Sequence, residues 1–216
     1  MADPAITRCE HTVPNEAALC DAYELELQSA CGKRVRFGEL VAGKGSHITT
    51  VVIFIRHFFC KYDQDYVRKV SQHLTESVLE TLPNPTGPSQ LIIIGCGDPR
   101  RIVPYVAETN TPFPIYTDPT GRIYKTLRMK KSLSGVTRPP SYAKASFFGS
   151  LRLVFKDMLR SGLRVFNGGS WRQNGGEWVF RGRRCVYAHR METVSDHLTA
   201  EQLIEVLGQD VPPVKA

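Results

Sequence analysis

Residues Thr49–Cys60 read TTVVIFIRHFFC, and this stretch decides how the rest of the chain is interpreted. From Thr49 to Ile55 every side chain is β-branched or aromatic, so both faces of the segment are apolar. Such a run is typical of a central strand that is covered on both faces. The residues after Cys60 place apolar side chains at helical spacing, at Tyr66, Val67, Val70, Leu74, Val78 and Leu82. Cys60 is therefore predicted to lie where a buried strand ends and a helix begins.

Strands and helices are predicted to alternate along the rest of the chain. The expected elements are, in order, strands over 91–94 and 113–116 on either side of a helix over 98–108, a β-hairpin of 177–180 and 184–189, and a last helix over 199–207. Successive β-α-β units favour parallel strands with right-handed crossovers. With the hairpin and the last helix, this order predicts an α/β protein of thioredoxin-like fold, with a central mixed sheet flanked by helices.

The N-terminal residues are predicted to form an extension that packs on this domain. Residues 14–30 fit a helix that ends before Gly32, so residues 1–30 are interpreted as a helical extension and residues 31–210 as the domain itself. Arg34–Leu40 alternates in the manner of a short strand. A turn-rich insertion is expected around residues 132–165, and residues 150–164 fit a basic amphipathic helix.

The positive charge of the chain is local. Over all 216 residues, 28 Lys and Arg against 21 Asp and Glu give a net charge of +7. Residues 100–190 hold 18 of the basic side chains and 4 of the acidic ones. No nucleic-acid-binding module accompanies this basic segment, so we expect no nucleic acid as the partner.

The cysteines point to a reducing compartment. The six cysteines have neither the tight spacing of a disulfide scaffold nor a CxxC pair, and no cluster has metal-ligand spacing, so no metal is expected. The first residues hold no apolar signal-peptide core, and no apolar run approaches the length of a membrane span. We expect a cytoplasmic protein without a transmembrane segment.

Cys60 is the first candidate for chemistry. At a helix N-terminus, free N–H groups and the helix dipole favour a thiolate and lower the pKa of a thiol. Arg56 and His57 lie close in sequence, although strand alternation would place them on opposite faces. Asp63 follows one helical turn later and would raise the pKa of the thiol. Asp63 is either a general acid or base, with His57 titrating near neutral pH, or only a first-turn residue favoured by the helix dipole.

Cys96 is a second candidate thiol. It lies in the turn Gly95-Cys96-Gly97 that ends the second predicted strand. Ligands bind at this edge of open α/β sheets, so Cys96 is a candidate resolving cysteine. The alternative is a small residue that fits a tight turn.

Several stretches resemble one protein family. Val52–Cys60 is similar to the xVxFxRHFxC motif of the peroxiredoxin-like proteins related to selenoprotein U, within the alkyl hydroperoxide reductase/thiol-specific antioxidant superfamily. Other segments resemble landmarks of that family in the same order, at 32–40, 92–95, 115–119, 124–127, 171–176 and 196–197. The resemblance covers residues 30–208, and it rests on the ordered recurrence of motifs that are individually weak.

The resemblance implies reduction of an organic peroxide or endoperoxide through Cys60. Members of the family usually carry CxxC, in which the second cysteine resolves the oxidised first one, whereas Asp63 stands at that position here. A one-Cys cycle remains, with an external thiol such as thioredoxin or glutathione as reductant and no bound cofactor. A homodimer is compatible with such a cycle.

The resemblance also brings the loop at 171–176 to the active cysteine. Trp171 and Gln173 are then predicted walls of the pocket. Arg128 and Arg172 lie in basic segments that would cover the pocket, so they are predicted to contact an anionic small-molecule substrate.

The loss of CxxC leaves two other functions open. In one, the chain is a non-redox enzyme of specialised metabolism, such as a cyclase or isomerase, in which Asp63 and His57 act as acid and base beside Arg56 and Gln173. In the other, the chain is a binding or regulatory module without turnover.

Overall fold

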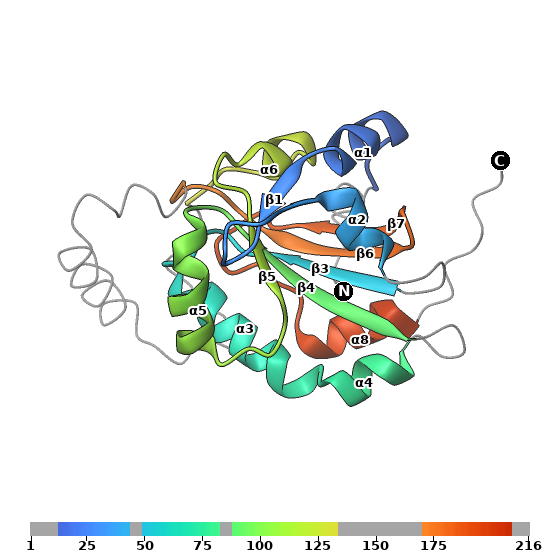
Figure 1. The fold of residues 1–216 in the computed structure, drawn as a ribbon. Helices are drawn as coiled ribbons and strands as arrows, with labels where there is room; N and C mark the ends of the chain where they lie inside the picture. Colours follow the sequence, from blue (N-terminus) through green and yellow to red (C-terminus); the bar gives the residue numbers. More distant parts are fainter. Residues whose placement is uncertain (1–12, 44–48, 83–87, 134–169, 209–216) are drawn as a thin grey trace, which may run out of the picture.

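The computed structural model describes residues 13–43, 49–82, 88–133 and 170–208 (Figure 1). Within these ranges the strands form one mixed sheet in the order β2-β1-β5-β4-β3-β6-β7. The strands are β1 (Glu26–Gln28), β2 (Arg34–Arg36), β3 (Thr49–Phe54), β4 (Ser89–Gly95), β5 (Ile115–Thr117), β6 (Gly176–Arg181) and β7 (Arg184–Arg190). The predicted α/β fold with a central mixed sheet is confirmed.

The middle of the sheet is parallel and its flanks are antiparallel. β3 pairs with β4 in parallel, from Thr49 opposite Ser89 to Phe54 opposite Ile94, and β4 pairs in parallel with β5. β6 runs antiparallel along the other side of β3 and forms a hairpin with β7. Because β3, β4 and β5 run in one direction, their carboxyl ends meet at one edge of the sheet, the usual place for a ligand site.

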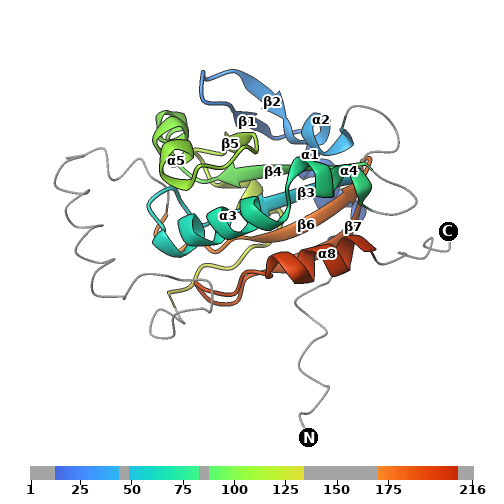
Figure 2. The ribbon, with the colours of Figure 1, turned by 90° about the horizontal axis from the view of Figure 1, so that it is seen from below.

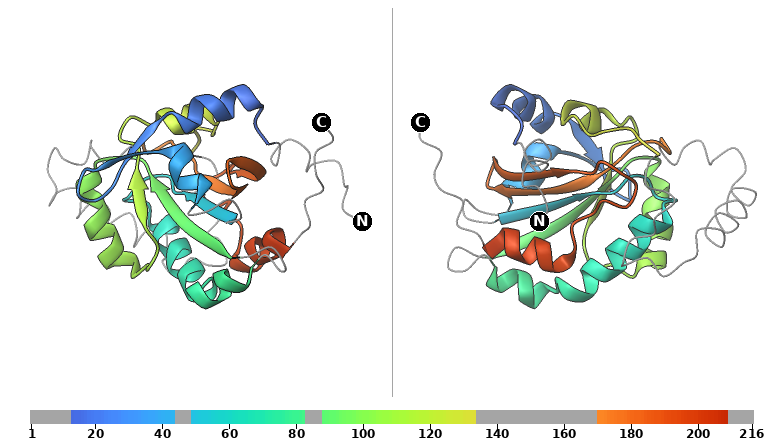
Figure 3. Two further views of the ribbon diagram at one scale, coloured as in Figure 1. Left: turned by 45° about the vertical axis from the view of Figure 1, so that its right-hand side comes forward. Right: turned by 180° about the vertical axis from the view of Figure 1, so that it is seen from behind.

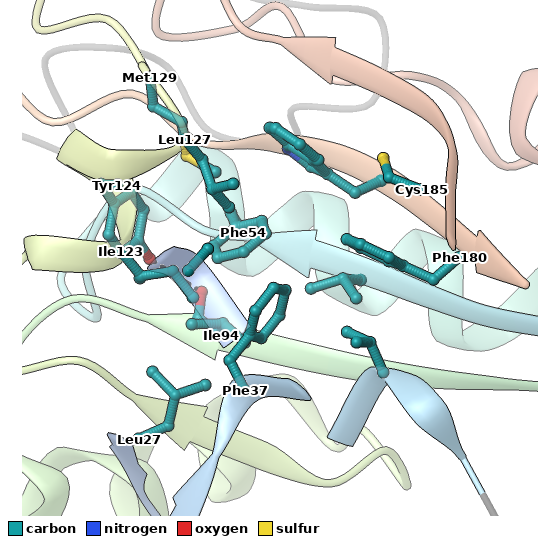
Figure 4. Close-up of a cluster of buried hydrophobic side chains, with 14 of the residues drawn as sticks. Leu27, Phe37, Phe54, Ile94, Ile123, Tyr124, Leu127, Met129, Phe180 and Cys185 are labelled. Atoms are coloured by element: carbon teal, nitrogen blue, oxygen red, sulfur yellow. Dashed lines mark hydrogen bonds between the residues drawn. The ribbon is translucent and has the colours of Figure 1, made fainter. Parts of the chain in front are cut away.

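Helices cover both faces of this sheet (Figures 1 and 2). They are α1 (Glu16–Tyr23), α2 (Phe37–Ala42), α3 (Lys61–His73), α4 (Glu76–Thr81), the short 3₁₀ helix Pro99–Arg101, α5 (Ile102–Thr109), α6 (Arg122–Thr126) and α8 (Ala200–Gly208). Side chains of α3, α4, α5 and α8 share one core with Val51 and Ile53, and α8 lies beside α3 on this face (Figure 3). Side chains of α1, α2 and α6 share the opposite core with Val52 and Phe54. Figure 4 shows Phe37 of α2 and Ile123 and Tyr124 of α6 in this core beside Phe54. Alternate residues of β3 thus enter different cores, as its doubly apolar sequence predicts.

The helix predicted after Cys60 is divided in the structure. It forms α3 and α4 because Thr75 caps a new helix, with its hydroxyl accepting the Val78 N–H at 3.4 Å. The last helix agrees with the prediction, since α8 begins after Thr199, whose hydroxyl accepts the Gln202 N–H at 3.3 Å.

The N-terminal elements are shorter than predicted. The helix expected over 14–30 ends at Tyr23, and Glu26–Gln28 forms β1, which pairs with β2 and β5. Leu27 of β1 is buried in the core, so these residues serve the sheet rather than the helix. The strand expected over 34–40 ends at Arg36, where α2 begins. The domain boundary at residue 30 stays a prediction, and β1 on its N-terminal side belongs to the common sheet.

Two of the predicted segments cannot be compared with the structure. The insertion around 132–165 lies almost entirely outside the described residues, and the basic helix over 150–164 lies entirely outside them. Among the helices of the described ranges, none has the length and apolar character needed to cross a membrane.

Candidate functional site

The turn between β3 and α3 brings Cys60 and Arg56 together. β3 ends at Phe54, and Cys60 immediately precedes the first turn of α3, so the predicted strand-to-helix junction is confirmed. Nη1 of Arg56 donates a hydrogen bond to the Cys60 sulfur at 3.2 Å, and Cys60 is only 5% exposed. Strand alternation no longer applies after Phe54, which leaves the Arg56 side chain free to turn toward the thiol.

Arg56 is held in place by a loop that is distant in sequence. Its Nε donates to the Gln173 carbonyl at 3.1 Å, and its Nη2 donates to the Trp171 carbonyl at 2.7 Å. The loop reaches β3 because residue 175 is glycine: a Cβ on Gly175 would lie 1.8 Å from the Phe54 carbonyl oxygen. A guanidinium that donates to three fixed acceptors is a preorganised positive charge beside the thiol.

Asp63 acts on the same thiol from the first turn of α3. Its side chain is fully buried, and its Oδ2 accepts the backbone N–H of Arg56 at 2.6 Å. Burial would raise the pKa of Asp63, but the hydrogen bond and the positive charge of His197, together with the charge of Arg56, lower it below its usual value. Asp63 is therefore a buried carboxylate that is ionised at neutral pH.

The Cys60 thiol is protonated at rest. Burial and the charge of Asp63 raise its pKa to about 12, against the opposing charge of Arg56. The prediction that the helix N-terminus lowers the pKa of this thiol is wrong, because desolvation and a neighbouring carboxylate outweigh the helix dipole. Nucleophilic reaction at the sulfur therefore needs a base, and Asp63 is a buried carboxylate beside it.

His57 lies against Trp171, with their ring centroids 4.9 Å apart, and is 2% exposed. Burial and the positive charge of Arg56 lower the pKa of His57 to about 4. The prediction that His57 titrates near neutral pH is therefore wrong. Its Nδ1 has no hydrogen-bond partner among the described residues. His57 is thus a neutral imidazole that packs against Trp171.

A buried cluster of charged groups extends from Asp63 into the sheet. Nε2 of His197 lies 3.2 Å from Oδ1 of Asp63, and Nδ1 of His197 lies 2.5 Å from Oε1 of Glu177. Oε2 of Glu177 lies 2.7 Å from Nδ1 of His189. Nε2 of His189 lies 3.6 Å from the carboxylate of Asp196, which is partly exposed. The cluster therefore runs from the Cys60 loop to the surface at Asp196.

Mutual attraction keeps the groups of this cluster charged. Burial lowers the pKa of His197, but Glu177 and Asp63 raise it to about 9; burial likewise opposes His189, but Asp196 and Glu177 raise its pKa to about 10. Burial raises the pKa of Glu177, but the two histidines lower it to about 2. Within the described ranges no group of three or more His, Cys, Asp or Glu is arranged to hold a metal ion. The cluster is a network of ion pairs between carboxylates and histidines.

Glu177 and His189 are not among the residues that the sequence predicts for the site, and His197 enters there only as part of a family landmark. A signal for the first pair exists in the hairpin. Glu177 is a charged residue within the otherwise apolar run GEWVF, and a buried charge requires a partner. The hairpin register places Glu177 directly opposite His189. Register and charge together identify this pair, whereas no comparable signal connects either residue with Asp63.

Aromatic side chains form the outer side of the Cys60 turn. The ring of Trp171 lies parallel to that of Phe59, with centroids 6.4 Å apart, and Trp171 is 37% exposed. The guanidinium of Arg101, which was not predicted as a site residue, lies 4.2 Å from the centroid of the Phe59 ring. The exposed Trp171 ring therefore lies against the buried Phe59 of the thiol loop, which also carries the charge of Arg101.

The other predicted binding residues are placed differently. Gln173 is buried, and its side-chain amide donates to two backbone carbonyls. Its contact with Arg56 is made by its backbone carbonyl, which accepts the Nε–H of Arg56. Arg172 is exposed next to Trp171. Arg128 is exposed in the turn after α6, where its charge acts on Arg190. Arg172 and Arg128 as substrate contacts stay predictions.

A cleft of about 760 Å³ opens at the carboxyl edge of the parallel strands. Its described lining includes Cys96, Lys131, Thr120 and Gln173. Cys60 and Cys96 are both free thiols, and burial raises the pKa of Cys96. The role of Cys96 as a resolving cysteine stays a prediction.

Residues 73–193 match the AhpC/TSA antioxidant enzyme family. The mouse (Mus musculus) protein Peroxiredoxin-like 2C is 30% identical over 213 residues, which cover 98% of this chain and 87% of the mouse protein. The human (Homo sapiens) Peroxiredoxin-like 2C is 29% identical over 187 residues, which cover 86% of this chain and 78% of the human protein.

A solved structure shares the fold. Peroxiredoxin Q from Xanthomonas campestris superposes with a TM-score of 0.55 at 8% identity, and the match covers 92% of this chain and 96% of that chain. At this level of identity the likeness concerns the fold alone. Together with the match of the 73–193 segment and the full-length similarity to the mouse protein, it leads to one conclusion: the chain belongs to the AhpC/TSA antioxidant enzyme family, as a peroxiredoxin-like protein of thioredoxin-like fold.

Proposed function

We propose that this chain is a one-Cys thiol peroxidase that reduces an organic hydroperoxide or endoperoxide through Cys60. The observation that carries the proposal is the 3.2 Å hydrogen bond from the Arg56 guanidinium to the Cys60 sulfur. A fixed positive charge at this position stabilises both a thiolate and the negative charge that develops on a departing peroxide oxygen. Membership of a peroxiredoxin-like family supports a redox function of this type.

Asp63 handles the proton in the proposed reaction with a hydroperoxide. Because the thiol is protonated at rest, Asp63 takes the thiol proton as the sulfur attacks the terminal peroxide oxygen. The S–O bond forms, the O–O bond breaks, and the bonding electrons of the O–O bond leave with the alkoxide. The alkoxide then takes the proton from Asp63. The products are an alcohol and the sulfenic acid of Cys60.

An external thiol completes the cycle, because no second cysteine follows Cys60 in the first turns of α3. One thiol attacks the sulfenic sulfur, releases water and forms a mixed disulfide. A second thiol attacks this disulfide, restores the Cys60 thiol and leaves as the oxidised reductant. Thioredoxin or glutathione is the proposed donor, and the cytoplasm, where these thiols stay reduced, is the proposed location. The cycle is compatible with a monomer or a homodimer.

A coupled assay of peroxide consumption tests this function. The protein receives cumene hydroperoxide together with either the thioredoxin or the glutathione reducing system, and NADPH oxidation is followed. We expect Cys60→Ser to abolish turnover. Cys185→Ser, which changes another buried thiol, is expected to keep it. Peroxide reduction that survives in Cys60→Ser would overturn the proposal.

A second candidate function is non-redox acid–base catalysis of the cyclase or isomerase type. The ionised and fully buried Asp63, beside a thiol that stays protonated, favours it. Asp63 then acts as the base on a bound substrate, and the neutral His57 acts as its polar partner. Turnover that ignores reductants and survives Cys60→Ala, but is lost in Asp63→Asn, would identify this function.

A further inference from the structure

The cluster behind Asp63 takes no part in the steps proposed above. His197 lies 134 positions after Asp63 in the sequence, yet the two side chains meet with no exposed surface. Glu177, from β6, holds the other side of the His197 ring. Burying charged groups carries a large desolvation cost, and replacing such a network by apolar residues often leaves a protein equally stable. The presence of this network therefore calls for a role beyond stability.

The ionised states of Asp63 and Glu177, together with the contacts of the ring, decide the protonation state of His197. An ionised carboxylate can only accept hydrogen bonds. Nε2 of His197 faces Asp63 at 3.2 Å, and Nδ1 faces Glu177 at 2.5 Å. Both contacts are hydrogen bonds only when both ring nitrogens carry hydrogen. The ring is therefore an imidazolium, and the Tyr66 ring, stacked on it with centroids 4.0 Å apart, holds its plane.

The surroundings of His197 supply charges from several elements. Asp63 and Tyr66 face it from α3, and Glu177 faces it from β6. His189 of β7 binds the second oxygen of Glu177, and Asp196, which precedes His197 in the chain, approaches His189. Glu177 also accepts the backbone N–H of Leu198 at 3.3 Å. Glu177 is thus fixed from three sides, and it in turn fixes His197.

The same geometry limits what His197 can do. A ring that donates from both nitrogens has no lone pair to accept a further proton, so it does not pass a proton from Asp63 toward the surface. What it supplies is a fixed positive charge and a fixed direction. Oδ1 of Asp63 is tied to His197 and Oδ2 to the Arg56 backbone, so the carboxylate cannot rotate away from the Cys60 turn.

We propose that His197 is a positioning residue for the reaction at Cys60: locked between Asp63 and Glu177, it holds the Asp63 carboxylate in its ionised form and in the orientation of the base. The chemical purpose of this arrangement rests on the proposed function. The coupling between His197 and Asp63 does not, and it is measurable without any turnover.

The first measurement follows the Asp63 carboxyl carbon by NMR as a function of pH. His197→Gln keeps an amide that can donate but removes the positive charge. We expect the titration of Asp63 to move upward by about one pH unit or more relative to the wild-type protein, because a displacement of this size corresponds to the loss of a modest charge interaction. His73→Gln, at the exposed end of α3, is the matched control and should leave it unchanged. An unchanged Asp63 titration in His197→Gln overturns the proposal.

A second variant covers the case in which His197→Gln does not fold. Glu177→Gln keeps the ring but removes the carboxylate that holds it charged, so the titration of Asp63 should also move upward. If the titration of Asp63 in Glu177→Gln coincides with that of the wild-type protein, the proposal fails.

The pH profile of peroxide reduction is the second measurement. In His197→Gln the acid limb of kcat/KM should move upward with the Asp63 titration, so that the loss approaches about tenfold at pH values below that titration and disappears at pH 8. An equal loss at every pH indicates a structural role and overturns the proposal. A wild-type protein without peroxidase activity refutes the proposed function instead, while the carboxyl titration still tests the coupling.

Discussion

At Cys60, an arginine and a carboxylate act on the same sulfur in opposite directions. The Arg56 guanidinium favours the thiolate, whereas burial and the charge of Asp63 favour the thiol, and the thiol prevails. The site therefore differs from one that stores a reactive thiolate. We expect its sulfur to react slowly with general alkylating agents and, in the proposed mechanism, to become nucleophilic when Asp63 accepts the thiol proton.

Replacing Asp63 by asparagine separates the charge of this residue from its action as a base. Loss of the carboxylate charge should lower the pKa of Cys60. If this pKa falls by about one unit, the thiolate fraction at pH 8, and with it the rate of alkylation by iodoacetamide, should rise about tenfold. Peroxide reduction should slow by about a hundredfold, because the proton acceptor is gone. Quenched-flow mass spectrometry of the two reactions measures both rates. If both rates rise or both fall, Asp63 is not the base.

The sequence predicts part of this site because part of it is local. Cys60 and Asp63 are one helical turn apart, and Arg56 lies on the preceding turn, so their meeting follows from the strand-to-helix junction. The direction in which the pKa of Cys60 moves does not follow from the sequence, because it depends on how completely the folded chain excludes water. His197 is equally beyond reach, since only the tertiary fold brings it to Asp63.

At the level of elements, the β6–β7 hairpin and the segment before α8 carry the support of the site. β6 supplies Glu177, β7 supplies His189, and the residues that lead into α8 supply His197. Their contact with Asp63 joins this half of the sheet to α3. The stability of the hairpin and the charge state of the site therefore depend on the same ion pairs.

Glu177→Gln should destabilise the protein in a pH-dependent way. The pKa of Glu177 falls from 4.5 to about 2 on folding, so its contribution to the free energy of unfolding is present above pH 4.5 and is lost as the pH falls toward 2. The pKa of His197 and His189 rises from 6.5 to about 9 and about 10, so their contribution is present below pH 6.5 and is lost as the pH rises through these values.

The expected cost of Glu177→Gln is about 3 kcal/mol near pH 6, where both contributions are present. The difference in the free energy of unfolding between the two proteins should shrink toward pH 10. Urea unfolding at pH 6, 8 and 10 measures it. Glu192→Gln, at a partly exposed ion pair with Lys130, is the control and should change the free energy little at any pH. A cost of Glu177→Gln that is independent of pH would contradict this assignment of charges.

The elements themselves were predictable where the sequence pattern is long. The strands β3, β4, β6 and β7, of six or seven residues each, were all predicted, although the predicted runs 91–94 and 177–180 cover only the middle of β4 and β6. The three-residue β1 follows from no such run, because its single buried residue, Leu27, also fits the periodicity of the preceding helix. The break at Thr75 is concealed for the same reason, since the apolar spacing of α3 continues into α4.

For the whole molecule, the uneven distribution of charge suggests which substrate is preferred. The exposed Arg172, next to Trp171, lies in the basic part of the sequence and beside the loop that holds Arg56. Arg172→Gln should raise KM for an anionic fatty-acid hydroperoxide about fivefold, on the order of 1 kcal/mol, and leave KM for cumene hydroperoxide unchanged. Steady-state kinetics with the two substrates measures the difference, which should decline as salt is added.

Arg34→Gln is the control with the same change in net charge. Arg34 lies on β2, the outermost strand at one edge of the sheet, and pairs with Glu26 of β1, so KM for both substrates should stay unchanged. Arg128→Gln tests the second predicted contact in the same assay. If all three variants behave alike, the positive charge affects solubility and not substrate binding.

The most direct test of a catalytic Cys60 is to find which cysteine is oxidised first. The protein is exposed briefly to one equivalent of an organic hydroperoxide, sulfenic acid is trapped with dimedone, and each cysteine is quantified by mass spectrometry. By thiolate content alone Cys31 should react before Cys60, because Cys31 is exposed and its pKa is lowered by the Ser29 hydroxyl, whereas the pKa of Cys60 is about 12. A catalytic site at Cys60 reverses this order. We predict that the sulfenic acid adduct forms at Cys60; an adduct on Cys31 with Cys60 unmodified would contradict this role.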